Sequence, residues 1–263
     1  MKTFTILGAG KLGTIIAEAW KAGLLEGYRL AGVFSRNKED AVRLTAGTDA
    51  LATDSIDDII TLKADFAAEC ASIALLKEVC ITLLENGTSV IPLSIGAFAD
   101  EDFHERAVGA ALKGNSRIHI PSGAVGGFDV LSTVSLMARY GKTELKAGIH
   151  THKGPLSLKN TPLFEESLMD SEKTVFEGTT KEAIALLPTK VNVAVASALA
   201  TAGPADTNAA ITSVPGFIGD DHMITAETEG LKATVDIYSA TSDIAAWSVV
   251  ALMRNLNSPI VFF

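Results

Sequence analysis

Residues 2–20 read KTFTILGAGKLGTIIAEAW, and this stretch decides the fold. A short β-rich run ends at glycines spaced G-x-G-x-x-G, and a segment with helical spacing of apolar residues follows. In a strand–turn–helix unit, Gly8 allows the tight turn, Gly10 leaves room for a pyrophosphate, and Gly13 lets the helix approach the sheet. The phosphate would meet the N–H groups that begin the helix. We therefore predict a dinucleotide-binding loop, with a structural turn as the alternative, and expect cofactor contacts from Gly8, Gly10, Lys11, Leu12 and Gly13.

The rest of the first half alternates strand and helix. Further strands are expected at 28–35, 64–71, 88–97 and 116–123. Helices are expected between them, at 38–47, 55–62, 73–87 and 100–114. This alternation predicts an α/β fold, a Rossmann-type doubly wound parallel sheet with helices on both faces.

The second half predicts a separate α+β domain. Helices are expected at 124–141, 179–188, 192–203 and 242–256, and strands at 143–154 and 174–178. The segments at 207–216, 222–230 and 231–239 alternate in the antiparallel manner, with Glu229-Gly230 as a hairpin turn. We expect a dinucleotide-binding domain at 1–121 and a substrate and dimerisation domain at 122–263. The last helix is a candidate to pack back on the first domain.

Composition and charge exclude several classes of function. The 263 residues are 48% hydrophobic, which is ample for a core, and the net charge is −9 without any run rich in Lys and Arg. Nucleic-acid and anionic-membrane partners are therefore not expected. The N-terminus lacks a signal-peptide pattern, and no apolar run is long enough to span a membrane. Cys70 and Cys80 lie in apolar stretches without partners at metal-ligand spacing, so we expect free thiols, no metal, and a cytoplasmic location.

The end of the second expected strand bears on the choice of cofactor. Sites that prefer NAD usually place an acidic residue there, whereas this chain reads FSRNK at 34–38. Ser35 and Arg36 are suited to hold a 2′-phosphate, and an arginine also stacks on adenine. We favour NADP over NAD; in the alternative interpretation, Arg36 is a solvated loop charge.

Five later segments carry a resemblance to a known family. They are ECAS (69–72), SIGAFADEDF (94–103), IPSGAVGGFD (120–129), LPTKVNVAVASAL (187–199) and DDHMITAETEG (220–230). In this order, the sequence resembles the L-aspartate dehydrogenase family. The resemblance implies NAD(P)-dependent oxidative deamination of L-aspartate to iminoaspartate, which hydrolyses to oxaloacetate and ammonia. It also implies a Rossmann domain followed by an α+β domain, a small amino-acid or keto-acid substrate, and a homodimer.

The resemblance also implies cofactor contacts. Ala71 and Ala124 would contact the dinucleotide, and Asn192 would contact its nicotinamide part. Small residues at 122–127 would let the backbone approach the ring, although a hinge that needs glycine for its backbone freedom is the alternative. An amide both donates to and accepts from a carboxamide, whereas the alternative for Asn192 is a helix cap.

His222 matches the active-site histidine of the family's N-x-H-E-I motif. Oxidation of an amine needs a proton partner near neutral pH, which imidazole supplies. The other histidines have weaker claims: His104 lies on an expected helix and His119 on an expected strand. His150 and His152 share one face of a strand that leads to Lys153, and from that face they would reach the site.

The chain departs from the family's pattern near the expected substrate. Met223 stands where the motif has glutamate, Lys190 replaces the first Asn of N-V-N, and YSATS at 238–242 keeps only Thr241 and Ser242 of N-P-K-T-S.

A dicarboxylate substrate needs positively charged side chains to bind it. Lys153, in HKGPL, is the best candidate, and Arg139 and Lys190 are weaker candidates. The expected substrate is therefore L-aspartate or a close analogue. An imine or carbonyl reductase of the same fold and a non-catalytic dinucleotide sensor are the alternatives.

Overall fold

The computed structural model describes residues 1–187 and 192–262. This part of the chain divides into two compact units. The first comprises residues 1–123 together with the segment from Ala245 onward, and the second comprises residues 124–244. The break at 123/124 lies two residues after the expected boundary, and most of the last helix belongs to the first unit. None of the helices among the described residues is long and apolar enough to cross a membrane.

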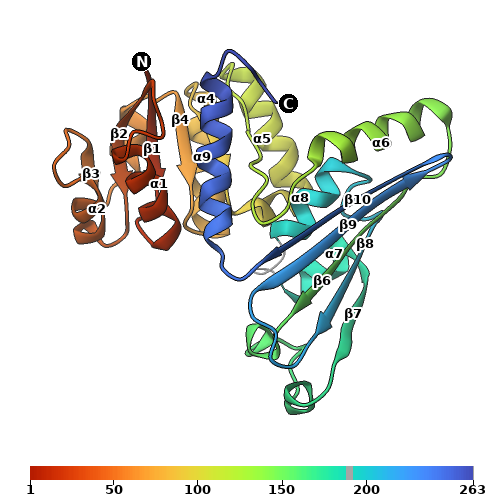
Figure 1. Cartoon of the computed structure of the whole chain (residues 1–263). Coiled ribbons are helices and arrows are strands. Elements are labelled where there is room, and N and C mark those ends of the chain that lie inside the picture. Colours follow the sequence, from red (N-terminus) through yellow and green to blue (C-terminus); the bar gives the residue numbers. More distant parts are fainter. Residues whose placement is uncertain (188–191, 263) are drawn as a thin grey trace. The chain divides into compact units, whose positions relative to one another are not determined.

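The first unit has the predicted Rossmann-type fold. Its described strands pair in parallel in the order β3-β2-β1-β4-β5 (Figure 1). The strands are β1 (Lys2–Leu7), β2 (Tyr28–Phe34), β3 (Leu51–Thr53), β4 (Phe66–Glu69) and β5 (Ser89–Pro92). The helices are α1 (Lys11–Lys21), α2 (Lys38–Thr45), α3 (Ile56–Thr61), α4 (Ile73–Glu85), the 3₁₀ turn η1 (Ile95–Ala99) and α5 (Glu101–Lys113).

Burial on both faces explains the apolar strands of this sheet. Residues Phe4 to Leu7 of β1 are all buried, as expected for a strand covered by helices on either side. The core also includes Val249 and Met253 of the last helix, α9 (Asp243–Asn257). The Tyr28 hydroxyl donates to the Met253 carbonyl over 2.8 Å, which ties this helix to β2.

The prediction of a full strand at 116–123 is wrong. The backbone of the segment pairs with the sheet through a bridge between Ile118 and Val90, with hydrogen bonds from the Val90 amide to the Arg117 carbonyl and from the His119 amide to the Val90 carbonyl. The next ladder bonds would need N–H groups from Pro92 and Pro121, and proline has none. The pairing therefore stops after one bridge.

The second unit contains a mixed sheet in the order β10-β9-β6-β8-β7. The strands are β6 (Lys146–Lys153), β7 (Lys173–Thr179), β8 (Thr207–Ser213), β9 (Asp220–Thr228) and β10 (Leu231–Ser239). The helices are α6 (Phe128–Gly141), α7 (Thr180–Leu186) and α8 (Asn192–Ala200), with the 3₁₀ turns η2 (Pro155–Leu158) and η3 (Glu166–Met169). The β9–β10 hairpin forms as predicted, but β8 pairs in parallel with β6. The long connection between β6 and β8 makes parallel pairing possible.

Strand alternation gives the second sheet two different faces. Along β6, Ala147, Ile149, Thr151 and Lys153 are buried, and the residues between them are not fully buried. We call the face that carries these four residues the inner face. Helices α6, α7 and α8 pack against it (Figure 1). The opposite, outer face carries His150 and His152.

Candidate active site

The structure explains the three motif glycines in different ways. Gly8 has a φ of +113°, which favours glycine, and a Cβ added there would lie 2.9 Å from the Cβ of Ala71. A Cβ on Gly13 would overlap the Gly8 carbonyl oxygen. A Cβ on Gly10, in contrast, would meet no described atom within 4 Å. Gly8 and Gly13 are therefore required by the fold, whereas Gly10 faces open space, as a pyrophosphate cradle requires.

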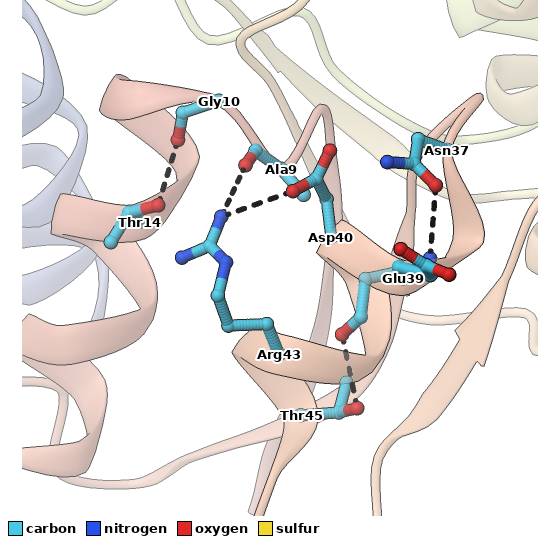
Figure 2. Close-up of polar contacts among 9 residues, drawn as sticks. Ala9, Gly10, Thr14, Asn37, Glu39, Asp40, Arg43 and Thr45 are labelled. Atoms are coloured by element: carbon cyan, nitrogen blue, oxygen red, sulfur yellow. Dashed lines mark hydrogen bonds and ion pairs between the residues drawn. The ribbon is translucent and has the colours of Figure 1, made fainter.

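The start of α1 also fits an anion. Gly10 is the N-cap and brings no side-chain cap, and the first turn, with Lys11 and Leu12, contains no acidic residue. Thr14 closes the first helical turn through its amide and hydroxyl, which both donate to the Gly10 carbonyl over 2.9 Å (Figure 2). A helix start with this arrangement favours a bound phosphate through its N–H groups and its dipole.

A second arginine, Arg43, contacts the glycine loop directly. Arg43, on α2, donates to the Ala9 carbonyl over 3.2 Å and to Asp40 over 3.5 Å (Figure 2). Arg36 is exposed in the connection between β2 and α2, next to Ser35, whose amide donates to the Thr53 carbonyl. Sequence reasoning missed Arg43. Its position on the helix that follows the second strand was the signal in the sequence that could have identified it.

Glu69, at the end of β4, organises the turn that carries Ala71. This carboxylate is fully buried and accepts hydrogen bonds from the amides of Ala71 and Ser72, over 2.8 and 2.9 Å, and from the amide and hydroxyl of Ser94. Burial raises the pKa of Glu69 and these hydrogen bonds oppose the rise. Ala71 in turn lies against Gly8. Sequence reasoning missed Glu69, although a carboxylate in an apolar strand was a visible signal.

Two of the three glycines of SGAVGG, at 122–127, are explained by the backbone. Gly123 and Gly127 have φ values of +63° and +66°, and a Cβ on Gly127 would overlap Val235 of β10. Ala124 between them is half-buried. These positions need glycine for the backbone, and the cofactor contact of Ala124 stays a prediction.

His222, on β9, lies on the inner face of the second sheet. It is paired in register with Thr151 of β6, and its Nδ1 lies 2.9 Å from the Thr151 hydroxyl. Its side chain is buried and lines a small cavity of about 20 Å³. The cavity is also lined by Lys153 and by Val193 and Ala194 of α8. The structure thus brings His222 and Lys153, both predicted site residues, to one place.

The His222 imidazole is held neutral. Burial is the main cause that lowers its pKa, Asp220 opposes the shift and the Lys153 ammonium adds to it, and the net result is a pKa of about 4. A neutral ring at pH 7 retains a lone pair and is able to accept a proton.

Lys153 forms an ion pair that sequence reasoning missed. Its side chain is only 10% exposed, and its Nζ lies 3.2 Å from Oδ1 of Asp220. The two residues are register partners on β6 and β9, one row along the inner face from Thr151 and His222. Asp220 precedes His222 by two residues on the same strand, and this spacing places both side chains on one face. That spacing was the signal in the sequence that could have identified Asp220.

The expectation that His150 and His152 reach this site is wrong. They share a face, with ring centroids 4.4 Å apart, but it is the outer face, because strand alternation places them opposite Thr151 and Lys153. His152 lies 3.9 Å from Asp221, which is also on the outer face. His104 is half-buried on α5, and His119 lies in the segment that bridges to β5.

The remaining predicted residues are placed as follows. Asn192 is the first residue of α8, directly before the cavity-lining Val193 and Ala194. Arg139 is exposed in the last turn of α6. Lys190 lies outside the described residues. Cys70 and Cys80 are free thiols, and the described residues contain no cluster of His, Cys, Asp or Glu suited to a metal ion.

Comparison with known proteins covers both units. Residues 134–256 match the family model described as aspartate dehydrogenase, C-terminal, and residues 8–121 match the NAD-binding domain of homoserine dehydrogenase. The L-aspartate dehydrogenase of Methanococcus maripaludis strain C5 is 34% identical, over 97% of each chain. The chain belongs to the L-aspartate dehydrogenase family. The predicted family and enzyme class, an NAD(P)-dependent oxidoreductase acting on CH–NH₂ groups, are confirmed.

Other relatives agree with this family. The L-aspartate dehydrogenase of Methanospirillum hungatei is 31% identical, over 97% of each chain. The crystal structure of aspartate dehydrogenase from Thermotoga maritima covers the whole of both chains with a TM-score of 0.78 and 27% identity. Together with the loop geometry, the matches support a nicotinamide dinucleotide as cofactor. The cytoplasmic location stays a prediction.

Proposed function

We propose that this protein oxidises L-aspartate, or a close analogue, with NADP or NAD to the imine, and that it also runs the reverse reaction. The imine then hydrolyses to oxaloacetate and ammonia. The proposal rests above all on His222, a buried and neutral imidazole that lies beside a cation on the inner face of the second sheet. In this proposal, the first unit binds the dinucleotide and the second unit provides the groups that handle the substrate.

The proposed proton chemistry uses both nitrogens of His222. In the tautomer in which Nδ1–H donates to Thr151, Nε2 carries the lone pair that a base needs. Nε2 takes a proton from the substrate ammonium, and the neutral amine that results is able to release its Cα hydrogen with the bonding electrons. A bound nicotinamide ring would accept that hydride. The imidazolium then releases its proton to solvent, and the regenerated neutral ring is able to activate the water that adds to the imine.

The other predicted residues would bind the two ligands. Gly8, Gly10, Lys11, Leu12 and Gly13 would hold the pyrophosphate, since Gly10 leaves open space and α1 begins without a side-chain cap. Ala71 and Ala124 would contact the dinucleotide, and Asn192 would contact its nicotinamide part. Lys153 would bind a substrate carboxylate, because its ammonium lies on the inner face close to His222.

An absorbance assay tests the function. Purified protein is incubated with NAD or NADP and a panel of amino acids, and the reverse reaction is followed with keto acids, ammonia and the reduced cofactor. We expect formation of reduced cofactor at about 340 nm with L-aspartate. Turnover only of other imines or carbonyls would favour a reductase instead, and cofactor binding without turnover of any substrate would indicate a sensor.

For the cofactor, we propose a preference for NADP that depends on Arg36. No acidic residue stands at the end of β2, and Arg36 is exposed there. Replacing Arg36 with alanine is expected to weaken NADP by about 1.5–3 kcal/mol, the scale of a charged hydrogen bond, and to change NAD little. Calorimetric titration with both cofactors measures this. Arg43→Ala is the comparison variant, and an equal loss for NAD and NADP in Arg36→Ala would contradict a 2′-phosphate contact.

We also propose a homodimer. The outer face of the second sheet supports this, since the large apolar side chain of Met223 is exposed there. Exposed apolar surface of this kind is a common site of contact with another chain. Sedimentation equilibrium is expected to give twice the mass of the chain. Met223→Lys places a charge on this face and is expected to shift the protein toward the monomer, whereas a monomeric wild-type protein would contradict the proposal.

A further inference from the structure

The Lys153–Asp220 pair is the starting point, and it lies at the end of the inner face. Lys153 ends β6 and Asp220 begins β9, and their charged atoms are 3.2 Å apart. The lysine is nearly buried, whereas the aspartate side chain is 42% exposed. The adjacent row on the same face consists of Thr151 and His222. A positive and a negative group therefore lie side by side, next to the imidazole that we propose as the base.

Asp220 has unused capacity to bind a ligand. Its Oδ1 accepts no hydrogen bond from the described residues, although Lys153 lies nearby. A carboxylate accepts several hydrogen bonds, and a buried oxygen without one is costly. Asp221, the next residue, is not an equivalent candidate because it points to the outer face, toward His152.

We propose that Asp220 binds the ammonium group of an α-amino-acid substrate while Lys153 binds a carboxylate of the same molecule. This inference rests on the proposed function and deepens it, since it names the group that selects an amino acid over a simple dicarboxylate. Without substrate, the two side chains pair with each other. When a zwitterion binds, its ammonium contacts Asp220 and its carboxylate contacts Lys153, and these two contacts replace the pair.

The same carboxylate suits the reaction itself. The substrate ammonium gives one proton to Nε2 of His222 and becomes an amine. The Cα–H bond then breaks, its electron pair leaves with the hydrogen to the dinucleotide, and the nitrogen lone pair forms the C=N bond. The nitrogen is again positive in the iminium product of this step. Asp220 therefore faces a cation in the bound substrate and again in the iminium product, and its charge stabilises the positive charge that develops during hydride transfer.

Binding to the complex with reduced dinucleotide tests this, because no oxidation occurs there. The two probes are L-aspartate and succinate, which has the same two carboxylates and no amine. Asp220→Asn keeps the shape and removes the charge, so it is expected to weaken L-aspartate about ten-fold and succinate less than two-fold. Lys153→Met is expected to weaken both ligands. Asp221→Asn, with the same charge change on the outer face, is the matched control and should change neither.

Two results would overturn the inference. Equal weakening of L-aspartate and succinate in Asp220→Asn would show that Asp220 only holds Lys153 in place, and unchanged binding of both would show that it takes no part. Asp220→Ser, which also removes the carboxylate, provides a second variant if the first unfolds. Wild-type protein that binds neither probe would contradict the proposed substrate itself, and the inference with it, which separates that failure from the other two.

Discussion

Replacing His222 with alanine is expected to lower kcat by about 10²–10⁴-fold, the usual contribution of a general acid–base residue. The imidazole is buried, neutral and hydrogen-bonded to Thr151, so its loss removes the proton acceptor in the site. Steady-state kinetics with L-aspartate measures the effect. Cofactor affinity should hardly change, because His222 is not among the residues that we propose to contact the dinucleotide.

The comparison variants for this prediction separate chemistry from structure. His222→Asn keeps a polar side chain, but an amide does not accept a proton as the imidazole lone pair does, so this variant should also be slow. His104→Ala, on α5 of the first unit, should retain wild-type kcat. Wild-type kcat in His222→Ala would mean that the histidine is structural, and the proposed mechanism would then fail even though the fold and the family stand.

Replacing Gly10 with valine is expected to abolish dinucleotide binding while the protein stays folded. A Cβ at residue 10 would meet no described atom within 4 Å, so a small side chain there is not expected to disturb the fold. The same space is where we expect the pyrophosphate, which valine would displace. Calorimetric titration with NAD and NADP, together with thermal unfolding, measures binding and folding separately.

Two other glycines provide the controls. Gly13→Ala should destabilise the protein, because its Cβ would overlap the Gly8 carbonyl oxygen at the contact between α1 and β1. Gly109→Ala, on α5, meets no described atom within 4 Å and should bind the cofactor as the wild type does. Normal dinucleotide affinity in Gly10→Val would contradict the placement of the pyrophosphate at this loop.

Local signals in the sequence determined the first unit and its loop. The glycines at 8, 10 and 13 are contiguous with the strand and the helix that they join, so their roles follow from one short segment. The alternation of strand and helix predicted the parallel sheet, and the hairpin at Glu229-Gly230 formed where its turn residues indicated. The strand expected at 116–123 failed because its ladder depended on Pro92, a residue of the neighbouring strand.

The substrate side of the candidate site was decided by tertiary structure. Periodicity showed that His150 and His152 share one face and that Lys153 lies on the other, but it did not show which face is covered by helices. The packing of α6, α7 and α8 decided that, and the register between β6 and β9 placed Asp220 against Lys153 and Thr151 against His222. These partners are about seventy residues apart in the chain, and strand pairing over such a separation depends on the whole sheet rather than on local sequence. The motif match pointed to His222; its neutral state and its charged neighbours follow from burial and from that register.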